Sequence, residues 1–385
     1  MAVALAGAPA SAQESASEFS LRGFATLGMA RTGSDDAEFV RDLSQPRGIS
    51  SHWSGLIDSV LGVQANWQLA PKVEAVVQGV SRYRHDRSFT PTLAWAYLKY
   101  DPTPALSLRA GRLGTEFFMQ ADSRWVGYSF LTVRPVGDYF WYLPFYSIHG
   151  ADAALSLPVG EAVLRGKAFF GYSQGRIPLA EEQWNIGGSP MLGGYLEWFN
   201  GPWHLRASYA NIRFHHDLPL SEVLKPQIGR GLTALESDFL ATEGSRSHYY
   251  ALGAMYDNGP WQGQLQLNRI EQGSHSFESS SGGYALLGYR IASLTPYLGY
   301  SWVRSQTEGM APPNLIAAYV VSDSHADQRT TIAGLRWDLA RNTALKAQWD
   351  GVRGTPTSVF PYRMENRARW NGKLDVYSLT LDFIF

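Results

Sequence analysis

Apolar and polar residues alternate in segments of about ten residues, and this period of two limits the fold more than any other feature of the sequence. The pattern is clearest at the end of the chain, where residues 377, 379, 381, 383 and 385 are Tyr, Leu, Leu, Phe and Phe, and residues 378, 380 and 382 are Ser, Thr and Asp. Successive side chains of a strand point to opposite faces, so such a segment has one apolar and one polar face. About ten tilted residues also suffice to cross the hydrocarbon core of a bilayer.

The alternation predicts sixteen strands. They fall at 19–31, 56–68, 73–83, 91–100, 106–116, 148–157, 162–172, 190–199, 203–213, 247–257, 261–271, 282–291, 295–305, 326–338, 343–353 and 373–385. An even number of strands is what a single-chain bacterial barrel requires.

The connections between these segments alternate between short and long. Short turns are expected at 70–72, 101–105, 158–161, 200–202, 258–260, 292–294 and 339–342. Longer polar loops are expected at 32–55, 84–90, 117–147, 173–189, 214–246, 272–281, 306–325 and 354–372. Aromatic residues gather at the short-turn ends of the strands: Trp67, Tyr100, Trp198, Trp203, Tyr256, Trp261, Tyr297 and Trp337. Short turns on one rim, long loops on the other and an aromatic girdle are typical of an all-β transmembrane antiparallel barrel.

Composition narrows the alternatives. The chain has no cysteine, which excludes a disulfide framework and thiolate metal sites. No stretch is apolar enough for a spanning helix, and the net charge of −1 gives no general attraction to nucleic acid. A soluble sandwich or propeller would also alternate, but it would not explain the aromatic rim and the alternating loop lengths together.

The first residues indicate export. Residues 1–12 are small and apolar and end in Ala10-Ser11-Ala12, which is similar to a signal-peptide cleavage site. We expect 1–12 to be the remnant of a signal peptide, 13–18 a short N-terminal segment and 19–385 the barrel. A basic region before the apolar run is missing, and an Ala-rich disordered tail is the alternative.

The face opposite the apolar one should line the interior of the barrel. The charged residues expected to line the pore are Arg22, Glu74, Arg82, Arg109, Asp152, Arg165, Lys167, Glu197, Arg206, Arg290, Arg336, Lys346 and Asp350. Cations outnumber acids among them, which predicts a mild preference for anions. The alternative is that these charges pair with one another and give no selectivity. Arg112, Arg213, Arg269 and Arg304 depart from the alternation and are expected near the rims.

Nothing in the sequence indicates catalysis. No nucleophile with a base, no phosphate-binding glycine loop and no metal-ligand spacing is found, so we expect no catalytic residue, no metal and no cofactor. His215-His216-Asp217 is a weak metal pattern in an outer loop. The rival function is an outer-membrane barrel enzyme, which would need aligned Ser, His and acid side chains.

Three segments carry a resemblance to a known family. They are 24–28 (Phe-Ala-Thr-Leu-Gly), 108–112 (Leu-Arg-Ala-Gly-Arg) and the terminal 377–385, which ends in Phe385. The chain resembles the sixteen-stranded Gram-negative outer-membrane porins. The resemblance implies a water-filled channel for passive diffusion of small hydrophilic solutes, and a homotrimer in contact with lipid and lipopolysaccharide. It also implies that Phe385 is an assembly signal for the barrel-insertion machinery. A substrate-specific channel for an organic acid, sugar or phosphate is the alternative.

The same resemblance implies a constriction. The third outer loop of that family folds into the barrel, and its counterpart here is 117–147, with Asp122, Arg124, Arg134 and Asp138 as candidate constriction residues. The Pro-Glu-Phe-Gly-Gly sequence of the enterobacterial porins is absent from this loop. An outward surface loop without a channel role is the other interpretation.

Overall fold

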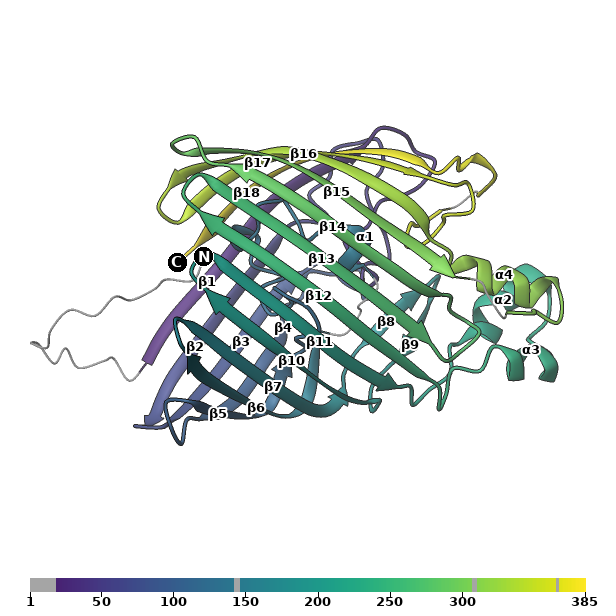
Figure 1. Cartoon of the computed structure of the whole chain (residues 1–385). Coiled ribbons are helices and arrows are strands. Elements are labelled where there is room, and N and C mark those ends of the chain that lie inside the picture. Colours follow the sequence, from purple (N-terminus) through teal and green to yellow (C-terminus); the bar gives the residue numbers. More distant parts are fainter. Residues whose placement is uncertain (1–18, 142–145, 307–309, 365–366) are drawn as a thin grey trace, which may run out of the picture.

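The chain forms a closed barrel of sixteen antiparallel strands in a computed structural model (Figure 1). The structure describes residues 19–141, 146–306, 310–364 and 367–385. Each strand pairs with its neighbours in sequence, and the first strand pairs with the last. The predicted fold class is therefore confirmed.

The barrel strands begin and end close to the predicted positions. They are β1(Phe19–Thr32), β2(Val60–Ala70), β3(Val73–Arg82), β4(Thr92–Tyr100), β5(Leu106–Gly114), β6(Ser147–Val159), β7(Ala162–Ser173), β10(Pro190–Asn200), β11(Trp203–Arg213), β12(Arg246–Asn258), β13(Trp261–Gln272), β14(Ser279–Tyr289), β15(Leu294–Gln306), β16(Asp327–Ala340), β17(Thr343–Gly354) and β18(Lys373–Ile384). The fifth strand ends at Gly114, two residues before the predicted end, and this shortening frees Glu116 from the strand.

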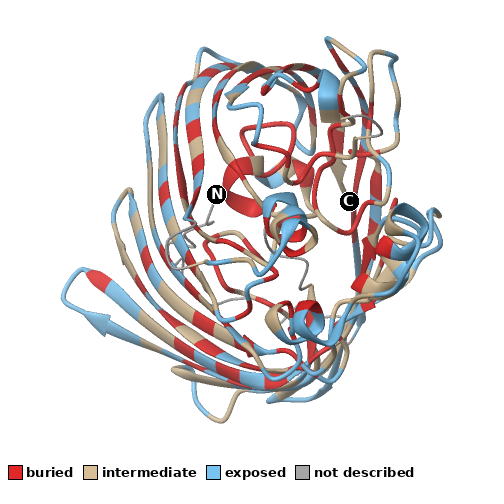
Figure 2. Cartoon of the chain, turned by 90° about the vertical axis from the view of Figure 1, so that its right-hand side faces the viewer, coloured by how far each residue is buried: buried red, intermediate tan, exposed pale blue. Residues whose placement is uncertain are grey.

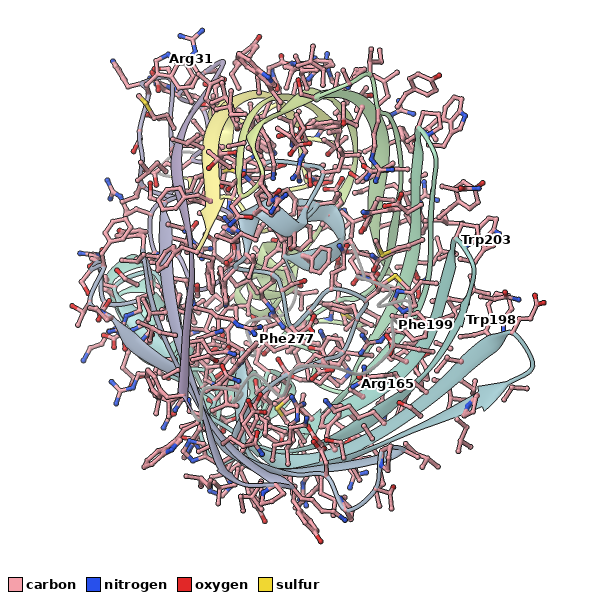
Figure 3. The ribbon with its side chains drawn as sticks, turned by 90° about the vertical axis from the view of Figure 1, so that its left-hand side faces the viewer. Arg31, Arg165, Trp198, Phe199, Trp203 and Phe277 are labelled. Atoms are coloured by element: carbon pink, nitrogen blue, oxygen red, sulfur yellow. The ribbon has the colours of Figure 1, made fainter. Side chains whose placement is uncertain are left out.

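Buried and exposed residues alternate along the strands, as the bands in Figure 2 show. The exposed positions are mostly Leu, Val and aromatic residues, which form an apolar outer belt suited to lipid. Trp198 and Trp203 project outward near the rim of short turns (Figure 3). The sequence places Tyr297 in this girdle, but its ring points inward and is buried, because Pro296 and Leu298 occupy the outward positions of β15.

The outer connections carry secondary structure that the sequence did not predict. The connection 174–189 contains the hairpin of β8(Arg176–Leu179) and β9(Glu182–Asn185). Three helices lie beyond the same rim, α2(Leu220–Ile228), α3(Ala234–Phe239) and α4(Leu315–Asp323), and they pack on one another through a small apolar core (Figure 1). In the described part of the chain, no helix has the length and apolarity needed to cross a membrane.

The ends of the chain close the barrel. Phe385 accepts a hydrogen bond from the backbone N–H of Gly23 at 2.7 Å and donates one to its carbonyl at 3.0 Å. The ring of Phe385 lies over Gly23, where any larger side chain would collide with it. The last residue therefore completes the seam between β1 and β18.

Deleting Phe385 should lower the amount of assembled barrel, because it removes two backbone hydrogen bonds and the ring that covers the seam. The heat-dependent shift in gel mobility of outer-membrane fractions measures the folded amount. Phe19→Ala, which removes an exposed ring from the same rim, is the control. Equal levels of the truncated and full-length proteins would contradict this role of Phe385.

Candidate functional site: the barrel interior

The long connection between β5 and β6 lies inside the barrel over its described residues, 115–141 and 146. Its short helices η1(Gly127–Ser129) and α1(Gly137–Phe140) contact two nearby sets of strands, η1 against β1 and β18 and α1 against β13 to β16. We call this segment the inner loop. It begins two residues earlier than the sequence indicated.

Arg134 anchors the inner loop to the wall. Its guanidinium contacts Asp58 at 2.6 Å, Asp350 at 3.1 Å and the hydroxyl of Ser378 at 2.5 Å. All three charged side chains are almost fully buried. A buried charge is tolerated only when it is paired and hydrogen-bonded, so these contacts hold the loop at one position.

Further polar contacts hold the inner loop near Arg134. Asp138 accepts hydrogen bonds from Ser301 and Gln328, and Lys346 donates to the carbonyls of Gly127 and Thr132. Lys346 is fully buried and also pairs with Asp382 at 3.0 Å. Gly127 lies so close to Asp382 that a Cβ atom at this position would collide with the carboxylate. The loop backbone therefore substitutes for water as the partner of inward side chains.

Aromatic packing fills the space between these anchors. The ring of Phe117 stacks on Tyr249 at 5.5 Å, and Tyr139 meets Tyr284 at 5.4 Å. These rings belong to one buried cluster that joins the inner loop to strands around the barrel. Burying large rings removes apolar area from water, which explains why this aromatic segment lies inside rather than outside.

A second charged network lies on the wall formed by β5, β6, β7 and β10. Glu116 contacts Arg109 at 2.8 Å, Lys167 at 2.6 Å and the hydroxyl of Tyr195 at 2.9 Å. Asp152 contacts Arg109 at 2.6 Å and Lys167 at 3.1 Å. The sequence analysis did not list Glu116, because in the predicted strand 106–116 its position has the opposite parity to the inward Arg109. The only signal for it was its position at the strand end, where alternation stops applying.

The structure separates the thirteen predicted pore-lining residues into four groups. Arg22, Glu74, Arg82 and Arg165 point inward and are not fully buried. Arg109, Asp152, Lys167, Glu197 and Arg206 point inward and belong to ion pairs on one wall. Arg336, Lys346 and Asp350 point inward but contact the inner loop. Arg290 lies past the end of β14, where it pairs with Asp257 at the rim of short turns.

The four candidate constriction residues also differ in their surroundings. Asp122 is exposed and accepts a hydrogen bond from the backbone of Ser123. Arg124 is buried and donates to the carbonyls of Ala121 and Thr115 within the loop. Arg134 and Asp138 face the wall, as described above. Of the four, Asp122 alone presents its charge to solvent.

Three inward arginines make no ion pair with any described residue: Arg22, Arg82 and Arg165. Arg82 instead lies over the rings of Trp125 and Tyr146, at 4.0 and 4.6 Å from their centroids. Arg165 points into the barrel in Figure 3. Of the predicted inward acids, Asp152, Glu197 and Asp350 are paired, and Glu74 makes no ion pair with a described residue. Three unpaired arginines therefore stand against one unpaired acid on the described wall.

Solved structures of several outer-membrane proteins are similar to the whole chain. OmpF of Salmonella typhi in complex with daunomycin superposes with a TM-score of 0.57 at 13% identity, over 95% of this chain and 97% of that chain. The anion-selective porin from Comamonas acidovorans gives 0.54 at 14% identity, over 95% and 99%. The trimer form of OmpT from Vibrio cholerae gives 0.52 at 11% identity, over 95% and 99%. No protein-family model matches, and no curated protein matches in sequence.

The chain has the fold of the sixteen-stranded outer-membrane porins. The apolar belt on the outside of this porin fold agrees with a location in the bacterial outer membrane. The sequence-based assignment of fold and location is confirmed.

Within the described ranges, no group of three or more His, Asp or Glu side chains is arranged to hold a metal. In the outer loop that carries the His pair, Asp217 instead accepts hydrogen bonds from the backbone N–H groups of Thr242 and Glu243.

Replacing Arg134 by Met should loosen the inner loop, because it leaves Asp58 and Asp350 buried without their cation. Breaking a buried ion pair from one side costs about 3–5 kcal/mol. We expect a lower unfolding temperature in detergent and faster proteolysis within 115–146. Asp122→Asn, which changes an exposed charge of the same loop, should leave both nearly unchanged. A Met variant as stable as the wild type would contradict the anchoring role.

Proposed function

We propose that this chain is a non-enzymatic porin, which forms a water-filled channel for passive diffusion of small hydrophilic solutes and mildly prefers anions. The observation that carries the proposal is a closed barrel with an apolar outside, a polar wall and an inner loop that narrows the lumen. Such a barrel offers water and small solutes a polar route past the hydrocarbon core, where charged groups are costly.

Planar-bilayer recording of the purified protein tests this function. A diffusion channel should produce stepwise ion conductance that scales with salt concentration. Small neutral solutes should not block this conductance. A barrel that inserts without conductance would refute the channel proposal.

The uncompensated arginines support the anion preference. Arg22, Arg82 and Arg165 lack ion pairs with described residues, whereas most inward acids are paired. Charges matter most where low-dielectric walls approach each other, because the field is focused there. The similar structure from Comamonas acidovorans is that of an anion-selective porin, which agrees with the proposal.

Replacing Arg22, Arg82 and Arg165 together by Gln should shift the reversal potential in a salt gradient toward cations. The wild-type preference should also shrink at high salt, because the Debye length falls from about 10 Å at 0.1 M to about 3 Å at 1 M. Arg213→Gln, Arg269→Gln and Arg304→Gln remove three outward charges and serve as the matched control. Unchanged selectivity of the inward triple variant would show that other charges govern permeation.

A substrate-specific channel is the second candidate. The inner loop and the wall share a continuous aromatic cluster, which leaves less room for water than a purely polar lumen. Competition of candidate organic acids, sugars and phosphate with ion conductance would distinguish a specific channel from a general one.

We also propose contact with lipopolysaccharide at the outer rim. Three cations, Arg329, Arg353 and Lys373, lie directly opposite one another on the outward faces of β16, β17 and β18. All three are exposed, and only Arg353 has a carboxylate partner among the described residues, Asp375 at 3.0 Å. Like charges directly opposite each other on a sheet are destabilising. Phosphate groups of the outer leaflet would relieve this repulsion.

The variant Arg329→Gln/Lys373→Gln should bind vesicles containing lipopolysaccharide more weakly. Each cation near a charged membrane surface contributes about 1 kcal/mol, so the loss should be about thirtyfold. Binding of the labelled barrel to vesicles with and without lipopolysaccharide measures it. Lys72→Gln/Arg341→Gln, at the opposite rim, is the control. Equal binding by both pairs of variants would exclude this row of cations as the site.

Assembly completes the proposal. The trimer form of the OmpT relative supports a homotrimer for this chain. Phe385 at the seam supports its proposed role as a signal to the barrel-insertion machinery. The predicted signal peptide, residues 1–12, and the segment 13–18 lie outside the described residues.

A further inference from the structure

A cavity at the outer mouth of the barrel has the composition of a ligand site. Its volume is about 160 Å³, and it is walled by the outer connections together with the upper end of the barrel. The apolar part of its lining includes Trp184, Phe214, Phe277 and Leu218. Phe277 lies within the outline of the barrel when the molecule is viewed from the opposite end (Figure 3). A largely apolar pocket with few polar groups is typical of a small-molecule site.

The aromatic wall of the cavity is tightly organised. The ring of Trp184 lies 4.8 Å from Phe214 and 5.6 Å from Phe277, and the Trp184 indole N–H donates to the carbonyl of His216. Tyr249 lines the same cavity and stacks on Phe117 of the inner loop. The cavity therefore lies directly outside the narrowed part of the barrel.

One charge in the lining lacks a partner of opposite sign among the described residues. Arg363 donates hydrogen bonds to backbone carbonyls, those of Gln45 at 3.0 Å, Leu43 at 3.3 Å and Pro361 at 3.3 Å, and it forms no ion pair there. Burial lowers the pKa of Arg363 to about 10, while Asp42 and Glu38 act in the opposite direction, so this side chain is a cation at neutral pH.

The acids of the lining already have partners. Glu278 pairs with His325 at 2.7 Å, and Asp323 pairs with Arg367. Ser276 and Ser324 donate their hydroxyls to backbone carbonyls. The lining therefore leaves one positive charge open to a ligand, beside an apolar space.

The size of the space sets the size of the ligand. A dry apolar cavity of about 150 Å³ is known to hold one benzene ring. We propose that this cavity binds a small aromatic monocarboxylate, such as benzoate, with the ring among Trp184, Phe214 and Phe277 and the carboxylate on Arg363. A guanidinium binds a carboxylate through charge-assisted hydrogen bonds, which are stronger than those to backbone carbonyls.

This inference deepens the proposed function, since it names a solute class that would be held at the outer mouth before it passes the inner loop. The binding itself does not depend on conductance. The two proposals can therefore fail separately.

Fluorine NMR of the full-length barrel in lipid nanodiscs tests the site, because nanodiscs keep detergent out of an apolar cavity. The probes are para-fluorobenzoate, the uncharged para-fluorobenzamide and fluoroacetate, which has the carboxylate without the ring. We expect para-fluorobenzoate to bind at least about tenfold more tightly than either other probe, because the amide lacks the charged hydrogen bond and fluoroacetate lacks the buried ring. Equal binding of the acid and the amide, or no binding of the acid, would overturn the proposal.

Variants then locate the site. Arg363→Gln should weaken para-fluorobenzoate binding by about tenfold or more, and Arg363→Lys should lose less because it keeps the charge. Leu218→Phe adds volume to the lining without altering Arg363 and should also reduce binding. Arg176→Gln, an outer-loop arginine outside the cavity lining, is the matched control. Full binding by both Arg363→Gln and Leu218→Phe would show that the acid binds elsewhere.

Bilayer recordings of the same preparations separate this inference from the proposed function. Ion conductance without para-fluorobenzoate binding would refute the site and leave the channel. Para-fluorobenzoate binding without conductance would support the site and refute the channel.

Discussion

Hydrocarbon offers no hydrogen-bond partner to a peptide group, and the whole architecture depends on this constraint. Every backbone N–H and C=O that crosses the membrane must find a partner within the protein, so a sheet can cross only when it closes on itself. Here the closure is the pairing of β1 with β18, which extends from Phe24 to Thr32 and ends with Phe385 on Gly23. Because the surrounding medium is hydrocarbon, the outward side chains form a belt of Leu, Val and aromatic residues.

Closure creates a second problem inside the barrel, where a wide polar lumen would leave inward charges with only water as partner. The inner loop supplies partners for many of these inward side chains. Arg134, Asp138 and Lys346 exchange water for loop or wall partners and are buried. Arg22, Glu74 and Arg165, which lie near the short-turn ends of β1, β3 and β7, keep contact with solvent. The interior is thus asymmetric along the barrel axis, with buried side chains at the inner loop and solvent-exposed charges near the short turns.

At the outer mouth, packed outer connections surround an apolar space. Helices α2, α3 and α4 share a small apolar core of their own, and the hairpin of β8 and β9 brings Trp184 against Phe214. These contacts hold the outer connections in place around an apolar space, whereas the turns at the opposite rim are too short to build one. The outer end therefore offers a shaped apolar space that the rim of short turns lacks.

The amino-acid sequence by itself determined the strands, because the period of two and the turn residues are local properties of the chain. It also determined which face of each strand points inward, so Arg22, Arg109 and Lys346 were all placed on the inner wall. Only the tertiary structure decided which of them meets water, because that depends on where the inner loop lies, and its contacts join residues far apart in sequence. Arg134 reaches Asp350 and Ser378 across more than two hundred residues. Glu116 gained its partners because β5 ends at Gly114, and no alternation pattern records where a strand stops pairing.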